Sequence, residues 1–240
     1  MPFELSVVNK EELRDVLEML FYAYDESSAF VNAVYPHKIT KVGIEGLDMV
    51  VARLQYLIDI DPSIRWYKVT DSNTGEIVSA SQWNVYDKEK PPEMMLDGPP
   101  GSWATDEDKK YALEMFESFI MPRYNRYRQA DLPIICLNIM GTAKKYQHKG
   151  AATLQVEKFT ALADELNAIV RLLCPTPSIY AYMFAHQITT ESTTAARWLY
   201  EKNGFILSKE PGHWTIEAKS PEFAGRPKEY LFFMERPRTK

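Results

Sequence analysis

Two spacings of apolar residues, one typical of strands and one of helices, mark the start of the chain. Phe3–Val8 predicts a first strand. Asn9 can then cap a helix, with Glu12 three residues later completing a capping box. Apolar residues follow at helical spacing as far as Tyr24, which predicts one amphipathic helix. A second stripe of the same period predicts a helix over Gly43–Asp59.

The middle of the chain predicts a hairpin, a loop and a further helix. Residues 65–71 and 76–85 are rich in aromatic and β-branched side chains, and Ser72–Gly75 supplies the turn between them. Residues 87–103 hold many Pro and Gly and exceed the usual connection length, so this loop is either mobile or functional. An additional helix is expected over 106–129.

Two inner strands dominate the second half of the pattern. Residues 134–142 are apolar at successive positions, which is typical of a strand covered on both faces. A helix pattern follows from Thr153 to Asn167, and 179–190 predicts another inner strand. Thr193 can cap a last helix, which Gly204 stops. Late strands are expected at 206–209, 214–217 and 230–235.

This order of elements predicts an α/β fold. We expect a single mixed, mostly antiparallel central sheet flanked by helices on both faces, in one domain spanning residues 1–240. With 240 residues and 45% apolar content, the chain is large enough to bury a substantial core.

The strongest chemical signal is the stretch Tyr-Gln-His-Lys-Gly-Ala-Ala at residues 146–152. A strand, a turn of small residues and a helix leave several backbone N–H groups pointing outward, and with the helix dipole they can bind an anion. Small residues at 150–152 let a pyrophosphate approach, and His148 and Lys149 add positive potential. Taken alone, such a stretch is more often a tightly packed βα turn.

A second stretch, Thr-Thr-Ala-Ala-Arg-Trp-Leu-Tyr-Glu-Lys-Asn-Gly-Phe at residues 193–205, agrees with the first. Together the two resemble the cofactor loop and later helix of the GNAT acetyltransferase superfamily, closely over residues 134–205. The loop pattern Gln/Arg-x-x-Gly-x-Gly/Ala is matched by Gln147, Gly150 and Ala152. The helix pattern Asn-x-x-Ala-x-x-Leu-Tyr-Glu-Lys-x-Gly-Phe is matched by Ala196, Leu199, Tyr200, Glu201, Lys202, Gly204 and Phe205.

Two further stretches, Ala163–Glu165 and Trp66–Asp71, are most similar to the fungal branch of that superfamily. Three positions depart from the pattern: Ala152 stands where glycine is usual, Thr193 where asparagine is usual, and Lys144 where proline is usual. The first two keep the small size and the polar side chain, whereas the third changes the shape of the loop.

The resemblance implies acetyl-CoA as acyl donor and no metal. The donor would lie where the strands at 134–142 and 179–190 part, with its pantetheine arm bonded by strand backbone and its thioester carbonyl polarised by an N–H near Met140. The pyrophosphate would sit on the amides of 147–152. The residues that this places at the cofactor are Met140, Gly141, Thr142, Gln147, His148, Lys149, Gly150, Ala151, Ala152 and Thr193.

The resemblance also implies direct transfer, in which a neutral amine attacks the thioester and the CoA thiolate leaves. Tyr200 matches the position whose phenol faces the sulfur, which makes it the candidate general acid, although a core tyrosine would give the same pattern. No Asp or Glu lies within 134–142 to act as base. His186 in the second inner strand and Glu191 just past its end are the candidates, with a chain of waters as the alternative.

Composition limits the partners. A net charge of −5 argues against nucleic acid. The two cysteines, Cys136 and Cys174, form neither a disulfide framework nor a metal-ligand spacing. No apolar run reaches the length of a membrane span and the N-terminus lacks signal-peptide features, so we expect a cytoplasmic protein, either monomer or homodimer.

The expected function is acetyl transfer from acetyl-CoA to an amine, less so a hydroxyl, of a small molecule. Aromatic side chains are dense for one domain, at Trp66, Tyr67, Trp83, Tyr86, Tyr180, Tyr182 and Phe184. Most of them are expected in the core, and some would line an apolar acceptor pocket. Three alternatives remain open: a non-catalytic CoA- or ligand-binding module, a protein or peptide N-acetyltransferase, and a structural protein with coincidental motifs.

Overall fold

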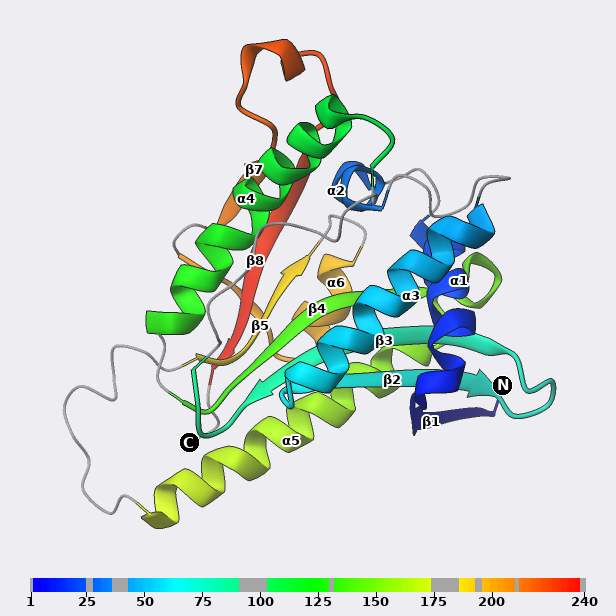
Figure 1. Ribbon diagram of the computed structural model, residues 1–240. Helices are drawn as coiled ribbons and strands as arrows, with labels where there is room; N and C mark the ends of the chain where they lie inside the picture. The colour runs from blue at the N-terminus through cyan, green and yellow to red at the C-terminus, as the bar shows by residue number, and fades with distance from the viewer. Residues whose placement is uncertain are drawn as a thin grey trace.

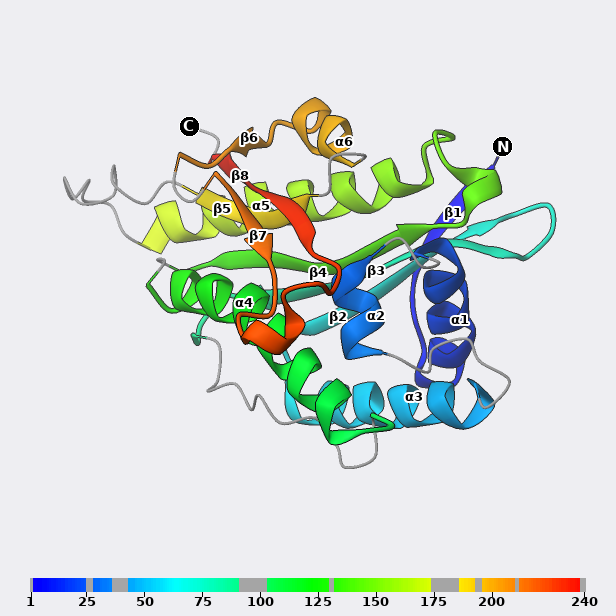
Figure 2. The ribbon, with the colours of Figure 1, turned by 90° about the horizontal axis from the view of Figure 1, so that it is seen from above.

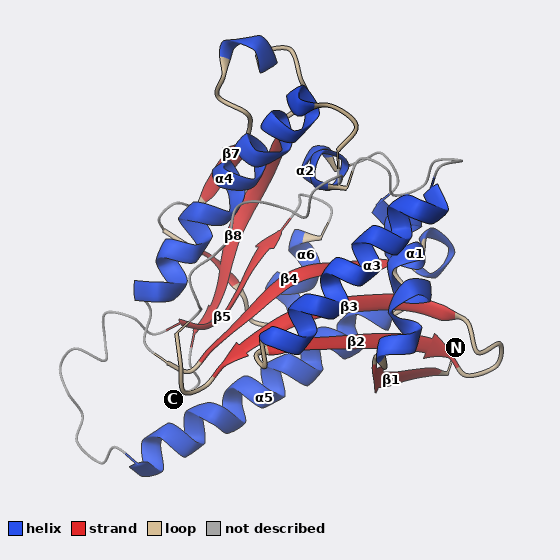
Figure 3. Ribbon diagram, in the orientation of Figure 1, coloured by secondary structure: helices blue, strands red, loops and turns tan. Residues whose placement is uncertain are grey.

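A computed structural model describes most of the chain, with gaps. The described residues are 2–24, 28–35, 43–90, 103–129, 132–173, 186–192, 196–209 and 212–237. Within them, only the backbone is described for 43–45, 126, 129, 167–173, 186–192 and 237. Strands form the centre of the molecule, with helices on either side (Figures 1 and 3).

The first half of the sheet is an antiparallel series of four strands in the order β1-β2-β3-β4. Their bounds are β1 Phe3–Val7, β2 Ile64–Asp71, β3 Ile77–Tyr86 and β4 Ile134–Thr142. The second half is also antiparallel, with β5, β6 and β7 all pairing with β8. Their bounds are β5 His186–Ser192, β6 Ile206–Leu207, β7 His213–Ile216 and β8 Glu229–Pro237.

The two halves are joined by very little pairing. β4 and β5 run parallel and meet only at Ile135 with Ile188 and at Cys136 with Thr189. The two strands diverge beyond that point (Figure 3). The mixed, mostly antiparallel character expected from the sequence is confirmed, and the strands follow one hydrogen-bonded path. That path consists of two antiparallel halves linked by this short parallel pair near the start of β4.

A β-bulge in β4 lies where the halves part. Gln82 on β3 pairs with Ile139, and the next residue, Trp83, pairs with Leu137, so Asn138 is an extra residue without an opposite number on β3. Regular strand alternation would send Asn138 and Ile139 to opposite faces. Both instead line the same cavity, because the bulge cancels one step of the alternation.

Helices cover both faces of the sheet (Figure 2). One face carries α5 (Ala151–Leu173) and α6 (Arg197–Lys202), and the other carries α1 (Leu13–Tyr24), α2 (Ala29–Val34), α3 (Gly43–Ile60) and α4 (Asp106–Gln129). On the α5 face, Phe159 stacks on Trp83 with ring centroids 4.1 Å apart. On the α1 face, Leu13, Leu17 and Leu20 are buried with Trp66 and Ala80 in a second core cluster.

Most of the predicted elements are confirmed, and the differences are local. The helix predicted from Thr153 begins two residues earlier and runs on to Leu173. The six-residue α2 was not predicted from the sequence, because it is too short to show a helical period. Glu191 was expected just past a strand but lies within β5, opposite Phe233. The predicted strand residues 179–185 and loop residues 91–102 lie outside the described residues.

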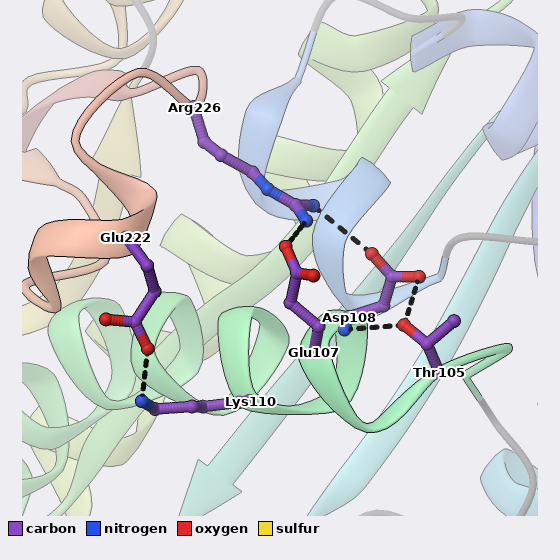
Figure 4. Close-up of polar contacts among 6 residues, drawn as sticks. All are labelled: Thr105, Glu107, Asp108, Lys110, Glu222 and Arg226. Atoms are coloured by element: carbon purple, nitrogen blue, oxygen red, sulfur yellow. Dashed lines mark hydrogen bonds and ion pairs between the residues drawn. The ribbon is translucent and has the colours of Figure 1, made fainter.

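A set of charged contacts fastens the segment before β8 to the start of α4 (Figure 4). Arg226 bonds Glu107 at 2.8 Å and Asp108 at 3.2 Å, and its guanidinium lies 4.7 Å from the centre of the Tyr111 ring. The same pair of carboxylates raises the pKa of Arg226. Lys110 pairs with Glu222 at 2.5 Å. These contacts fix the position from which β8 enters the sheet, beginning with Glu229.

Candidate cofactor and acceptor site

The second half of β4 has one edge that no described strand pairs with. Met140, Gly141 and Thr142 pair with β3 on one side. On the other side the pairing with β5 ends at Cys136, so within the described residues the edge from Leu137 to Thr142 is open to an extended ligand. This is the region that the sequence assigned to the pantetheine arm.

The backbone carbonyls in this region already accept hydrogen bonds from side chains. The Tyr24 hydroxyl donates to Met140 O at 2.9 Å, and Ser79 Oγ donates to Gly141 O at 2.9 Å. The side-chain amide of Gln147 donates to Thr142 O at 3.2 Å. Gln147, predicted to act at the pyrophosphate, therefore also ties its loop to the end of β4.

Gly141 is required by packing. A Cβ atom at this position would lie 2.8 Å from Leu20 Cδ2 and 3.5 Å from Ala23 Cβ, both on α1. Leu20 is fully buried, so it has little room to move away. The absence of a side chain at Gly141 allows α1 to lie directly on β4, which brings Tyr24 to Met140.

The loop after β4 is anchored on β3 although it lacks the usual proline. Ala143 N donates to Val78 O at 2.9 Å, and a short 3-10 turn covers Lys144–Tyr146. The Tyr146 hydroxyl donates to Glu76 Oε2 at 3.0 Å, and Lys145 also binds Glu76. The hydrogen bond from Lys145 lowers the pKa of Glu76. The loop is therefore held by side-chain contacts at the place where Lys144 departs from the family pattern.

Helix α5 begins with the unpaired amides that the sequence predicted. The first backbone bond of the helix runs from Leu154 N to Gly150 O. In the described part of the chain, no backbone carbonyl accepts from the amides of residues 148–153. His148 and Gly150 both adopt positive φ, at 61° and 95°. Space beside Gly150 is open, since a Cβ there would meet nothing within 4 Å. These are the features of an anion seat.

A tryptophan that the sequence did not single out flanks this seat. The Trp198 ring on α6 stacks on His148, with centroids 5.8 Å apart and planes 23° from parallel. Its side chain is 46% exposed. Lys149 Nζ lies 5.4 Å from the centre of the Tyr146 ring. The seat thus has a partly exposed aromatic ring and a lysine beside it, which suits a ligand with both a phosphate and a planar ring.

The catalytic candidates are only partly described. Tyr200 is 4% exposed and belongs to the core cluster that contains Leu137, while Met140 packs against that cluster. The Tyr200 ring contacts Phe205 edge-on at 5.5 Å. His186 and Glu191 lie on β5, but their side chains are outside the described residues, as is all of Thr193.

A cavity of about 1160 Å³ lies on the opposite face of the sheet, between α1, α2, α3 and α4. Its walls are mainly apolar and aromatic, and β4 contributes Cys136, Asn138 and Ile139. Among the aromatic side chains that the sequence singled out, Trp66 and Tyr86 line this cavity, whereas Tyr67 and Trp83 pack in the core beside α5. The cavity reaches the bulge in β4 from the side away from α5.

One cluster of polar side chains at this cavity is a hydrogen-bond network around Asn84. Asp61 accepts hydrogen bonds from Ser63 N at 2.9 Å, from Ser63 Oγ at 2.6 Å and from Asn84 Nδ2 at 3.2 Å. The bulge residue Asn138 donates to Asn84 Oδ1. Burial raises the pKa of Tyr86, which also lines the cavity. The donors to Asp61 in this network are all neutral groups, from Ser63 and Asn84.

A second cluster of polar groups is centred on Glu229, at the start of β8. Its Oε2 accepts from Ser28 Oγ at 2.7 Å and from Phe30 N at 3.0 Å. The neighbouring Tyr24 is half-buried, and the removal of its hydroxyl from water raises the pKa of that hydroxyl to about 12. The hydroxyl therefore stays protonated and donates to Met140 O at neutral pH. Sequence analysis could not find Glu229, because its partners on α2 are about two hundred residues away.

Comparison with known proteins bears on the fold. No protein-family model matches the chain, and no curated protein matches its sequence. Solved structures do match over nearly its whole length. An acetyltransferase of the GNAT family from Streptococcus pneumoniae has a TM-score of 0.50 at 12% identity, covering 99% of this chain and 100% of the other. The chain has the GNAT acetyltransferase fold.

Two other matching structures are acetyltransferases from insects. Arylalkylamine N-acetyltransferase 2 from Aedes aegypti has a TM-score of 0.57 at 14% identity and full coverage of both chains. A polyamine N-acetyltransferase from Drosophila melanogaster has a TM-score of 0.52 at 11% identity, covering 98% of this chain and 100% of the other. The particular resemblance to the fungal branch is not supported by these matches. Identities this low show the fold and leave the substrate to be argued from the site.

In the described part of the chain, no helix is both long and apolar enough to cross a bilayer. Nor do His, Cys, Asp and Glu side chains of the described residues gather in threes in a way that would hold a metal ion.

Proposed function

We propose that this protein transfers an acetyl group from acetyl-CoA to an amine of a small molecule. The observation that carries the proposal is the position of β4. Its open edge begins at the bulge and leads to the anion seat at the start of α5, and the acceptor-sized cavity reaches the same bulge from the other face. A donor on the edge and an acceptor in the cavity would meet at Asn138–Met140.

The residues present fit the donor. The amides of 148–152, with Lys149 beside them, would hold the pyrophosphate. The positive φ at residue 150 favours glycine, which has no side chain to block the approach of the pyrophosphate. The edge from Leu137 to Thr142 would bond the pantetheine arm in the manner of a missing strand. Thr193, which precedes α6 in the sequence, would complete the cofactor site.

The reaction needs three groups from the chain: a proton donor for the thiolate, a proton acceptor for the amine and a hydrogen-bond donor for the oxyanion. A neutral amine attacks the thioester carbonyl, the C–N bond forms, and the C–S bond breaks as the CoA thiolate leaves. Tyr200 would give that thiolate its proton, and His186, Glu191 or a chain of waters would take the proton lost by the amine. A backbone N–H near Met140 would stabilise the oxyanion.

The acceptor is proposed to be small because of the cavity. Its volume of about 1160 Å³ and mainly apolar walls suit a small molecule better than an extended peptide. The names of two matching structures, an arylalkylamine and a polyamine N-acetyltransferase, support an amine as the acceptor class.

Two measurements on the purified protein test the proposal. Acetyl-CoA at a hundredfold excess over its dissociation constant is expected to stabilise the fold by about 2.7 kcal/mol, seen as a raised Tm. Free thiol is expected to appear from acetyl-CoA when a panel of primary amines is added. A raised Tm without thiol release for any amine would favour the non-catalytic CoA-binding module. No change in Tm would favour coincidental motifs.

A further inference from the structure

The carboxylate of Glu229 is the feature of the cavity that the reaction outlined above does not use. We propose that Glu229 recognises the acceptor as a cation, binding its ammonium group, while the aromatic walls of the cavity hold an apolar or aromatic body. This rests on the proposed function for its link to catalysis, but the binding itself can be measured without acetyl-CoA.

Glu229 lines the cavity, and no positively charged side chain among the described residues bonds its carboxylate. It is half-buried, and both of its hydrogen bonds come from neutral donors to the same oxygen, Oε2. Three basic side chains also line the cavity, at Arg53, Lys109 and Arg123. In the described part of the chain, none of them forms a salt bridge with Glu229. A carboxylate partly removed from water and left unpaired costs free energy, which a bound ammonium would recover.

Aromatic rings surround the same point. Phe30, whose backbone N–H binds Glu229, contacts Phe119 edge-on at 4.6 Å and Phe116 at 6.5 Å. Tyr24 lies close enough for the charge of Glu229 to act on its hydroxyl. Aromatic faces attract cations and pack well on planar ligands, so they favour the same occupant as the carboxylate.

The location is suitable for an acceptor nitrogen. Tyr24 connects Glu229 to the reaction region, because its hydroxyl lies near Glu229 and donates to Met140 O at 2.9 Å. An ammonium on Glu229 would therefore be connected through Tyr24 to the residue whose backbone we assign to the thioester. Loss of one proton to the carboxylate or to an adjacent water would give the neutral amine needed for attack.

Asp61 provides a matched comparison, since it is the other carboxylate lining the cavity. Its two oxygens accept three hydrogen bonds from Ser63 and Asn84, so its charge is already well solvated by the protein. We therefore expect the ammonium to prefer Glu229 over Asp61.

The test compares three probes of similar shape by calorimetric titration: phenethylamine, neutral phenethyl alcohol and anionic phenylacetate. The wild-type protein should bind phenethylamine most tightly. Glu229→Gln keeps an oxygen for Ser28 and Phe30 but removes the charge, and should weaken phenethylamine binding about tenfold to a hundredfold while leaving phenethyl alcohol unchanged. Asp61→Asn should leave phenethylamine binding within about twofold. A melting curve for each variant checks that it is folded.

Several results would overturn the proposal. These are failure of the wild-type protein to bind phenethylamine, preference for phenylacetate, equal loss of amine and alcohol in Glu229→Gln, or a larger effect from Asp61→Asn. Failure of the proposed function has a different signature. If phenethylamine binds through Glu229 but no thiol is released from acetyl-CoA, the cation site stands and the acetyl transfer is wrong. If thiol is released, Glu229→Gln should raise KM for the amine and leave KM for acetyl-CoA unchanged.

Discussion

At the scale of single residues, Gly141 is fixed by contact and can be tested by a double-mutant cycle. Gly141→Ala should destabilise the protein by about 1–3 kcal/mol, because the added Cβ meets buried Leu20 on α1. Leu20→Ala alone should cost about 2–5 kcal/mol through its cavity. In the Leu20→Ala background the cost of Gly141→Ala should largely vanish. Denaturant unfolding of the four proteins measures the coupling, and additive costs would contradict the proposed contact.

Tyr200 separates a catalytic role from a packing role. Tyr200→Phe keeps the ring against Phe205 but removes the hydroxyl. If the phenol protonates the departing thiolate, turnover should fall by about 10²–10⁴-fold with little change in Tm. If the hydroxyl serves only the core, Tm should fall and turnover per folded molecule should persist. Both quantities are to be measured on one sample.

How far single residues could be predicted depends on whether their partners are near in sequence. Gly150 was recognisable, because a glycine at a strand-to-helix turn is a local pattern, and its φ of 95° agrees with that role. Glu229, Tyr24 and Trp198 were not, because each gains its role only when distant elements meet. Glu229 binds α2 across almost the whole chain, and no spacing in the sequence records that contact.

At the scale of elements, the start of α5 carries the donor assignment and can be tested at Gly150. Gly150→Asp and Gly150→Asn place side chains of nearly equal size at a positive φ that both tolerate better than most residues. The two variants should therefore be similarly stable. Gly150→Asp should bind CoA about tenfold or more weakly than Gly150→Asn, because its charge opposes the pyrophosphate. Equal affinities in a calorimetric titration would remove the pyrophosphate from this helix start.

Elements were predictable in proportion to the length of their pattern. The 24-residue α4 and the nine-residue β4 agree with the ranges expected from the sequence. β4 has a sustained apolar run, and α4 has a Thr105 cap followed by apolar residues at helical spacing. The six-residue α2 was missed, because its Ser28 cap and the carboxylate of Glu229 stabilise it more than any helical period does. The clamp of Arg226 on Glu107 and Asp108 likewise joins segments that the sequence leaves unrelated (Figure 4).

At the scale of the whole molecule, the apolar pattern predicted the class of fold, whereas the parting of two inner strands was implied only by the resemblance to the GNAT superfamily. Apolar residues at successive positions of β4 require cover on both faces, which the helices supply. The end of β4–β5 pairing after two residue pairs and the bulge at Asn138 depend on how the two halves meet, and neither has a local sequence signal. The cavity follows from the same arrangement, since its walls come from α1 to α4 and from five strands, β2, β3, β4, β7 and β8.

The central claim is that acetyl-CoA binds along the open edge of β4 with its pyrophosphate on the start of α5. Backbone hydrogen exchange with and without acetyl-CoA tests it most directly, because bonded amides exchange more slowly. The account predicts slower exchange at residues 148–152 and along the β4 edge from Asn138 to Thr142, with β1 unchanged as an internal control. Binding of acetyl-CoA that protects neither segment would contradict the account.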